Sequence, residues 1–293
     1  MKIIKIGSRE SRLAVVQSEN VISALHAAGY ETELVTMKTT GDKILDKTLD
    51  KIGGKGLFVK ELDAALRDGR VDFTVHSLKD MPMDTPDDLP LVAVSPRADV
   101  RDVLVLPEGV SMLSFDKPIG CSSARRRIQL QKLYPQARIE PVRGNVQTRL
   151  RKLDEGQYSS LVLAAAGLHR LGLQARIHRY FSVDEILPAA GQAIIAVQGR
   201  ADADASCLSA WRDDNAWSCM LAERAFVRTL DGGCSSPVAA HATLQGERLH
   251  LRGMYVSADE RIVRFGTIDG TSAQAEELGS TLAQRLRAGK ETP

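Results

Sequence analysis

Residues 2–37 read KIIKIGSRESRLAVVQSENVISALHAAGYETELVTM and determine how the chain begins to fold. The apolar run at 2–6 predicts a short strand, and apolar residues at helical spacing over 12–28 predict a helix that ends at Gly29. The segment TELVTM at 32–37 predicts a second strand. A strand, a helix and a strand in this order form a βαβ unit, in which the two strands run parallel. The N-terminal part is therefore predicted to be an α/β domain.

The alternation of strands and helices continues beyond this unit. A helix is predicted at 57–68, and strands are predicted at 71–76 and 90–94. The intervening residues 39–56, TTGDKILDKTLDKIGGKG, are polar, contain glycines and lack a clear period. Long segments of this kind are usually functional or disordered, so we expect a mobile loop that covers a cleft.

A second α/β block starts near residue 100, and a smaller α+β part follows it. The block contains predicted strands at DVLVL, 138–142 and 160–165, and predicted helices at 124–134 and from Asn145 onward. A strand at 193–199 and a helix at 215–230 lead into the C-terminal part, where strands at 249–257 and 261–268 precede a helix at 272–287. This order of elements predicts two α/β units and an α+β tail.

The composition is that of an ordinary globular protein. The chain has 293 residues, of which 43% are hydrophobic and 26% charged. This length corresponds to two domains, or three small ones, at about 150 residues per domain. The balance argues against disorder, collagen-like repeats and coiled coil.

The positive charge is concentrated in one stretch of the chain. In total, 39 Lys and Arg residues oppose 37 Asp and Glu residues, for a formal net charge of +2. Between Lys117 and Lys152 ten basic residues oppose the single acidic residue Glu140, so this stretch carries +9 and the rest of the chain −7. The position of the charge therefore predicts an anionic ligand for this stretch.

The N-terminus and the cysteines indicate a cytoplasmic protein without metal. The segment MKIIKIGSRESRL has no apolar run long enough for a signal peptide, and no stretch approaches the ~18 apolar residues of a membrane span. In a reducing compartment the four cysteines should stay free. They form no CxxC pair, and the histidines show no HExxH spacing, so we predict no metal site. The four are Cys121, Cys207, Cys219 and Cys234.

Two predicted strand-to-helix turns carry arginines. In GCSSARRR at 120–127, the serines can cap a helix whose first N–H groups bind anions, and the arginines add forked donors. The segment RGNVQTR at 143–149 repeats the arrangement. Ligands of open α/β sheets bind at the carboxyl ends of strands. The repetition favours a ligand site over a solvated basic face but leaves the class of anion open.

Two further motifs carry candidate chemical groups. In HSLKDMP at 76–82, a strand ends at His76, and Lys79 and Asp80 follow. A lone Asp is usually a cap or turn residue, but beside Lys79 it can stabilise a cation or accept an N–H, whereas we interpret His76 as structural. In LDGGCSSP at 230–237, two glycines precede Cys234 and permit close backbone approach. Such a turn can present the sulfur as a nucleophile.

A family resemblance is carried by the motifs GSRESRLA, GGKGLFVKEL, HSLKDMP, GCSSARRR, RGNVQTRL, LAAAGLHRLG, LPAAGQ and LDGGCSSP. In this order, between residues 7 and 237, they resemble the porphobilinogen deaminases, which are also called hydroxymethylbilane synthases. GGKGLFVKEL and HSLKDMP are each nearly diagnostic. The C-terminal part is compatible with the family but less distinctive.

The resemblance implies an α/β fold of three domains. Two lobes built like periplasmic binding proteins form a cleft, and a smaller α+β domain follows them. Domain 1 is expected at 1–96 and 194–212, with the catalytic aspartate and the mobile loop. Domain 2, which is rich in arginine, is expected at 99–190, and domain 3, with the cofactor-attachment cysteine, at 215–293.

The resemblance also implies a transferase of tetrapyrrole (haem and porphyrin) biosynthesis. It joins four porphobilinogen molecules head-to-tail into the linear tetrapyrrole hydroxymethylbilane and releases ammonia at each condensation. The chain grows on a dipyrromethane cofactor, one per chain, held by a thioether. On this resemblance Cys234 attaches the cofactor and Asp80 is catalytic. The cofactor is bound by Lys79, Ser122, Ser123, Arg125, Arg126 and Arg143, and the substrate by Arg9, Ser11, Lys55, Arg149, Arg170 and Gln192.

The implied chemistry suits these residue types. Every pyrrole ring carries an acetate and a propionate, so a growing chain needs many arginines rather than one phosphate pocket. Loss of ammonia from porphobilinogen leaves a cation, which a carboxylate at Asp80 can stabilise. Three positions depart from the family pattern: Cys121 stands where Thr is frequent, Ala193 where Gly is usual, and Gln198 where an acidic residue is common. We expect altered packing or interdomain motion at these positions, with activity retained.

Two other classes of protein are compatible with parts of the pattern. A non-catalytic two-lobed anion-binding module would explain the arginine turns but leaves Cys234 and Asp80 without a role. A nucleic-acid binder would suit the basic stretch, but Tyr134 is its only aromatic residue and offers little stacking surface. We therefore expect porphobilinogen as substrate and no nucleic acid or membrane as partner. The resemblance further implies a monomer that passes its product to uroporphyrinogen-III synthase.

Overall fold

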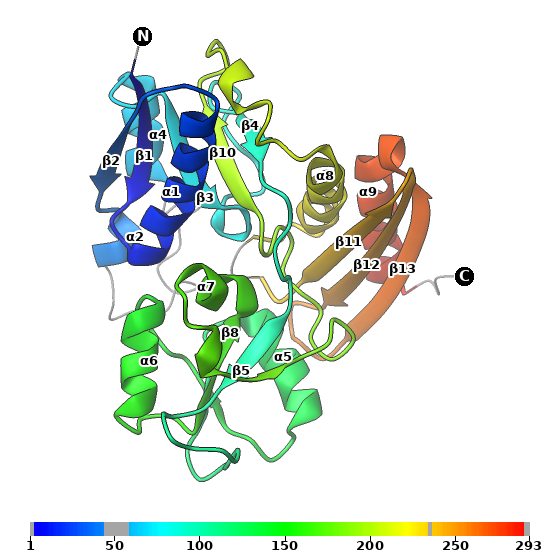
Figure 1. The fold of residues 1–293 in the computed structure, drawn as a ribbon. Helices are drawn as coiled ribbons and strands as arrows, with labels where there is room; N and C mark the ends of the chain where they lie inside the picture. Colours follow the sequence, from blue (N-terminus) through cyan, green and yellow to red (C-terminus); the bar gives the residue numbers. More distant parts are fainter. Residues whose placement is uncertain (1–2, 44–58, 234–235, 290–293) are drawn as a thin grey trace.

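Three β-sheets organise the chain in the computed structural model, which describes residues 3–43, 59–233 and 236–289 (Figure 1). Two five-stranded sheets form two lobes, and a three-stranded sheet belongs to a third unit beside them. The predicted fold class, two α/β lobes with a smaller α+β domain, is confirmed. No helix among the described residues is long and apolar enough to span a membrane.

The sheet of the first lobe has the strand order β2-β1-β3-β10-β4. As the βαβ pattern predicts, β1 and β2 run parallel, and β3 joins β1 in the same direction. Strand β10 follows the second lobe in the chain and runs antiparallel between β3 and β4. The bounds are Ile4–Arg9 for β1, Thr32–Met37 for β2, Phe73–Ser77 for β3, Leu91–Val94 for β4 and Ile195–Gly199 for β10.

Helices cover both faces of this sheet. Leu25 of α1 (Arg12–Ala27) packs with Ile6 and Phe73 on one face. Leu66 of α4 (Lys60–Arg67) packs with Leu89 and Met37 in a separate core. The predicted loop at 39–56 lies outside the described residues from position 44 onward. Its first part contains the short helix α2, Thr40–Lys43.

The second lobe repeats the strand pattern of the first. Its order is β7-β6-β8-β5-β9, with β7, β6 and β8 parallel and β5 antiparallel to β8 and β9. Alternate residues of β5 face opposite cores: Val103 packs near α6, and Leu104 packs near α5. The strands are β5 (Asp102–Val105), β6 (Ile119–Gly120), β7 (Ile139–Glu140), β8 (Ser160–Ala164) and β9 (Ile177–Tyr180); the helices are α5 (Ala124–Leu133), α6 (Val146–Asp154) and α7 (Ala165–Arg170).

The third unit packs two helices on one face of an antiparallel sheet. Phe226 of α8 and Leu282 of α9 meet Leu251 of β12 in its core. The other face of the sheet contacts the second lobe, where Met254 of β12 packs with Leu187 and Ile128. In the turn between β12 and β13, Glu260 accepts from Arg127 of α5 at 2.6 Å. The bounds are Asp214–Thr229 for α8, Ala239–Gln245 for β11, Arg248–Val256 for β12, Val263–Thr271 for β13 and Ala275–Ala288 for α9.

Two strands were not predicted from the sequence. Strand β11 reads AAHATLQ and β9 reads IHRY. Alanine is depleted in strands, and a four-residue polar strand has no period to detect. Both strands form because a neighbouring strand of the sheet supplies their hydrogen-bond partners: β12 pairs with β11, and β5 pairs with β9.

Candidate active site

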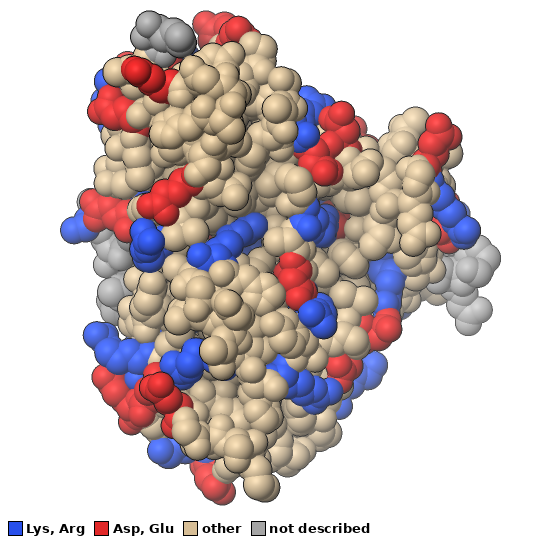
Figure 2. Space-filling view, in the orientation of Figure 1, with Lys and Arg blue, Asp and Glu red and all other residues tan. Residues whose placement is uncertain are grey.

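A cleft of about 530 Å³ separates the two lobes. Its walls come from the carboxyl ends of β1 and β3 in the first lobe and of β7 and β8 in the second. This is where open α/β sheets bind ligands. On the face shown in Figure 2, basic side chains lie along the line where the two lobes meet.

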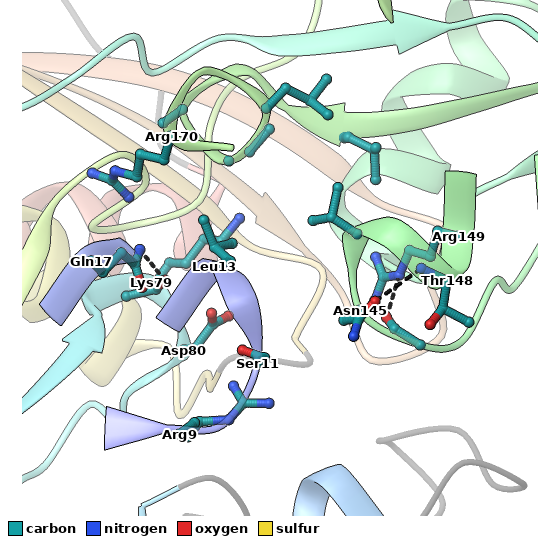
Figure 3. A pocket seen from close by; sticks show the side chains of 18 of the residues that line it. Arg9, Ser11, Leu13, Gln17, Lys79, Asp80, Asn145, Thr148, Arg149 and Arg170 are labelled. Carbon is teal, nitrogen blue, oxygen red and sulfur yellow. Dashed lines mark hydrogen bonds between the residues drawn. The ribbon is translucent and has the colours of Figure 1, made fainter. Parts of the chain in front are cut away.

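The first lobe presents a carboxylate between basic groups. Strand β3 ends at Ser77, and one turn of 3-10 helix, Leu78–Asp80, brings Lys79 and Asp80 to the cleft. Asp80 is exposed, whereas Lys79 is half-buried. Arg9 ends β1 and Ser11 follows it, and both lie beside Asp80 (Figure 3).

The second lobe contributes a wall of arginines. Arg143 and Arg149 flank the start of α6, and the Arg149 Nε donates to the Gly144 carbonyl at 2.8 Å. Gly144 has φ +112°, a conformation that L side chains rarely adopt. Arg170, at the end of α7, donates to the Ala193 carbonyl at 2.8 Å. Figure 3 shows Arg149 across the cleft from Asp80.

A buried ionic network lies behind the cleft wall. Asp102 is fully buried and accepts from Arg125 Nη2 at 2.8 Å and from Arg126 Nη2 at 2.7 Å. The Gln192 Nε2 donates to the same carboxylate at 2.8 Å, and the Lys79 Nζ lies 3.5 Å from the Gln192 Oε1. Although burial alone would raise the pKa of the Asp102 carboxyl, Arg125 and Arg126 hold that pKa well below its usual value.

Burial, and in two cases neighbouring positive charge, lowers the pKa values of three basic side chains of the cleft. Burial and the neighbouring Arg126 lower the pKa of Lys79 to about 8, against the opposing effects of Asp80 and Asp102. Burial lowers the pKa of Arg170 to about 10, and burial followed by Arg126 lowers that of Arg149. Among the described lining residues, seven cationic side chains face only Glu10 and Asp80. The cations are Arg9, Lys38, Lys79, Arg126, Arg143, Arg149 and Arg170.

The structure brings most of the predicted binding residues together, but not all of them line the cleft. Ser122 exchanges hydrogen bonds with the backbone of Val142, and the Ser123 Oγ caps α5 by accepting from the Arg126 N–H at 3.4 Å. Arg125 and Gln192 are buried behind the wall and bind Asp102. Lys55 and Cys234 lie outside the described residues.

The three departures from the family pattern occupy buried positions. Cys121, at the β6–α5 turn, directs its sulfur toward the Ser123 carbonyl at 3.7 Å. Ala193 has φ +71°, which explains why glycine suits this position. The Gln198 Nε2 donates to the Leu89 carbonyl at 2.8 Å, while its Oε1 has no hydrogen-bond partner among the described residues.

Sequence reasoning missed two residues that organise the site. Asp102 begins an otherwise apolar strand, DVLV, and a charged residue in a fully buried strand is a detectable signal. Gln17 of α1 is buried and lines the cleft, where its Nε2 donates to the Ser77 Oγ at 2.7 Å. No pattern in the sequence distinguishes Gln17 from a surface glutamine.

Comparisons with known proteins agree on one family. The family model "Porphobilinogen deaminase, dipyromethane cofactor binding domain" matches residues 4–207, and "Porphobilinogen deaminase, C-terminal domain" matches residues 217–288. The porphobilinogen deaminase of Acetivibrio thermocellus is 59% identical over 288 residues and covers 98% of both chains. That of Alkaliphilus oremlandii is 58% identical over 290 residues, with 98% of both chains covered.

The chain also has more distant similarities. The porphobilinogen deaminase of Chromobacterium violaceum is 47% identical over 292 residues, which cover 98% of this chain and 94% of that protein. Among solved structures, the methionine-binding protein MetQ aligns with a TM-score of 0.46 and 15% identity, over 73% of this chain and 89% of that one.

Proposed function

The chain belongs to the porphobilinogen deaminase family, and from this premise we propose that the cleft between the lobes is its active site. The protein is a transferase of tetrapyrrole biosynthesis that condenses porphobilinogen, with release of ammonia, into hydroxymethylbilane on a dipyrromethane cofactor. The observation that carries the proposal is Asp80, an exposed carboxylate in a cleft whose other walls are cationic.

The cleft suits a dipyrromethane with its acetate and propionate groups. Its volume of about 530 Å³ lies within the ~300–1,000 Å³ of typical small-molecule sites. The buried Arg126 Nε has no hydrogen-bond partner among the described residues, so a donor remains for a ligand carboxylate. We assign Lys79, Arg126 and Arg143 to hold this group directly. Ser122, Ser123 and Arg125 support the same wall from behind.

In each condensation, cationic side chains of the cleft bind carboxylates, and Asp80 stabilises a cation. When bound, the dipyrromethane supplies the free pyrrole carbon that is joined to the incoming porphobilinogen. Arg149 and Arg170 bind carboxylates through charge-assisted hydrogen bonds, and Arg9 and Ser11 bind the substrate beside Asp80. The Asp80 carboxylate stabilises the cation that forms on porphobilinogen as ammonia leaves, because fixed negative charge in a partly desolvated cleft needs no reorganisation. Gln192 and Lys55 complete the proposed substrate set.

Cys234 is our candidate for the thioether link. It follows α8, and at the edge of the described residues the Gly233 N–H donates to the Ser236 Oγ at 2.9 Å. The domain division that we propose follows the three sheets: 1–96 with 194–212, 99–190, and 215–293. We further propose a cytoplasmic monomer that passes hydroxymethylbilane to uroporphyrinogen-III synthase.

Intact-mass measurement tests the proposal most directly. The purified protein should exceed its sequence mass by two pyrrole units, and the added mass should map to the peptide that contains Cys234. Cys234→Ala should carry no adduct, whereas the matched control Cys207→Ala should carry it. A protein of bare sequence mass, with Cys234→Ala indistinguishable from the parent, would support a non-catalytic anion-binding module instead.

The role of Asp80 is tested by turnover. Asp80→Ala should keep the melting temperature of the parent, because the side chain is exposed, and should lose nearly all hydroxymethylbilane formation. Turnover close to that of the parent would contradict the assignment.

A further inference from the structure

Asp102 occupies an unusual position for a charged residue. It is the first residue of β5, where the chain enters the second lobe, and its side chain is 0% exposed. Its Oδ1 accepts from Arg126 Nη2 and Gln192 Nε2, and its Oδ2 accepts from Arg125 Nη2, all within 2.8 Å. Three charged or polar donors thus converge on one carboxylate.

These donors come from separate parts of the molecule. Arg125 and Arg126 begin α5 of the second lobe, whereas Gln192 lies in the segment that leads back to β10 of the first lobe. Gln192 also accepts from Lys79, at 3.5 Å, and Lys79 is adjacent to Asp80. A continuous chain of contacts therefore runs from the arginine wall, through Asp102, to the carboxylate on the opposite wall.

Arg126 and Lys79 are the members of this network that line the cleft. The Nη1 and Nη2 of Arg126 are held by the Val162 carbonyl at 3.3 Å and by Asp102 at 2.7 Å. An arginine fixed at two nitrogens loses little further side-chain entropy when it binds a carboxylate. Asp102 also supplies the nearest counter-charge for two buried guanidinium groups, which would otherwise repel each other.

We propose that Asp102 is a positioning residue for the condensation reaction: its buried carboxylate holds Arg126 at the cleft wall and, through Gln192, fixes Lys79 beside Asp80. This role rests on the proposed function of the cleft. Asp102 itself touches neither substrate nor cofactor, so its substitution should weaken ligand binding more than the chemical step.

The first test compares Asp102→Asn with the parent holoenzyme. Asparagine keeps the shape but replaces one acceptor oxygen with an NH₂ donor, which must face a donor of Arg125, Arg126 or Gln192. We expect the KM for porphobilinogen to rise about tenfold, as for loss of one charged hydrogen bond, while kcat changes less. Acquisition of the dipyrromethane mass by the apoprotein should also slow.

The pH profile separates positioning from a general loss of stability. Lys79 is faced by Arg125 and Arg126 of α5, by the adjacent Asp80 and by Asp102, whose charge raises the Lys79 pKa. Asp102→Asn should therefore move the alkaline limb of kcat/KM to lower pH. The matched control Asp63→Asn, at a buried carboxylate of α4 that does not line the cleft, should leave KM and this limb unchanged.

A double substitution tests whether Asp102 acts through Arg126. In an Arg126→Met background, Asp102→Asn should raise KM by a smaller factor than in the parent, because one of the two groups that it positions is gone. If Asp102→Asn raises KM by the same factor with and without Arg126, the positioning role is refuted. It is also refuted if Asp102→Asn alone keeps the KM and pH profile of the parent.

Two further comparisons keep the outcomes distinct. If Asp102→Asn does not fold, Asp102→Glu keeps the charge but moves the carboxylate by one methylene; a raised KM at the parent melting temperature supports the role, and a parent-like KM and pH profile refutes it. A parent protein that carries no adduct and forms no hydroxymethylbilane would instead refute the proposed function. A fully active parent with parent-like Asp102 variants refutes the positioning role alone.

Discussion

Glu223→Gln is expected to destabilise the protein at the junction of its three units. Glu223 lies on α8 and is fully buried. Its Oε1 accepts from the Ala242 N–H at 2.7 Å and lies 2.8 Å from Arg97 Nη2, while its Oε2 accepts from the Gly191 N–H at 2.7 Å. Because Arg97 and Gly191 belong to the two connections between the lobes, this carboxylate holds both connections to the third unit.

The magnitude follows from what glutamine can replace. Its single carbonyl oxygen can keep one backbone N–H, but its NH₂ group then opposes the other, and Arg97 loses its counter-charge. Removing one partner of a buried ion pair costs about 3–5 kcal/mol. Since 14% of the Arg97 side chain is exposed and can gain water, we expect the lower end, about 3 kcal/mol. At ~2–4 °C per kcal/mol for a protein of this size, the melting temperature should fall by about 6–12 °C.

Thermal unfolding with a matched control measures this effect. Glu260→Gln makes the same chemical change in a 39% exposed carboxylate, which pairs with Arg127 at 2.6 Å. An exposed pair contributes ~0–1 kcal/mol, so the control should shift the melting temperature by no more than about 4 °C. Equal shifts in the two variants would refute the reasoning, because burial would then not decide the cost.

Three other substitutions give independent tests. Lys79 is cationic below its pKa of about 8, so its hold on the dipyrromethane carboxylates should weaken and kcat/KM should fall as pH rises through 8. Lys79→Arg should remove this alkaline limb from kcat/KM; an unchanged limb would contradict the assignment. Burial, as the largest influence, raises the pKa of Asp63 from 3.8 to about 6. The contribution of the protonated Asp63 to the free energy of unfolding is therefore fully present below pH 3.8 and is lost as pH rises through 6. Urea unfolding should therefore find Asp63→Asn more stable than the parent by about 1 kcal/mol at pH 8 and equal to it near pH 4, whereas a pH-independent difference would count against this. In Gly279→Ala the new Cβ would lie 2.2 Å from the Ala222 carbonyl oxygen, a backbone atom, so α8 and α9 must separate; a loss of about 2–3 kcal/mol in thermal unfolding is expected, and a melting temperature at or above that of the parent would show that the helices adjust freely.

Local pattern was sufficient to predict the elements that carry the chemistry. The βαβ period over residues 2–37 predicted the parallel pair β1–β2, which is confirmed. The motif HSLKDMP predicted Lys79 and Asp80 at the end of a strand, and the structure places both in the cleft. These predictions succeed because the periods of 2.0 and 3.6 residues, and the turns that interrupt them, are properties of short segments.

The local pattern did not predict whether a side chain that follows a turn lines the cleft or is buried behind it. Arg125 and Arg126 are neighbours in one motif, yet Arg126 lines the cleft and Arg125 is buried behind it. Both arginines bind Asp102, but Arg125 also donates to the Leu187 carbonyl, 62 residues away, and Arg126 to the Val162 carbonyl, 36 residues away. No local period relates these residues, so only the folded sheet brings them together.

The sequence by itself determined the order of the elements, the α/β class and the cationic character of the ligand site, because each depends on residue type and local spacing. The tertiary structure decided which charges face the ligand and which support the wall. It inserted β10 between β3 and β4, and so brought Gln192 within reach of Lys79 and Asp102. These contacts join residues 90 and 113 positions apart, and their energy is available only after the chain has closed the long loops between them.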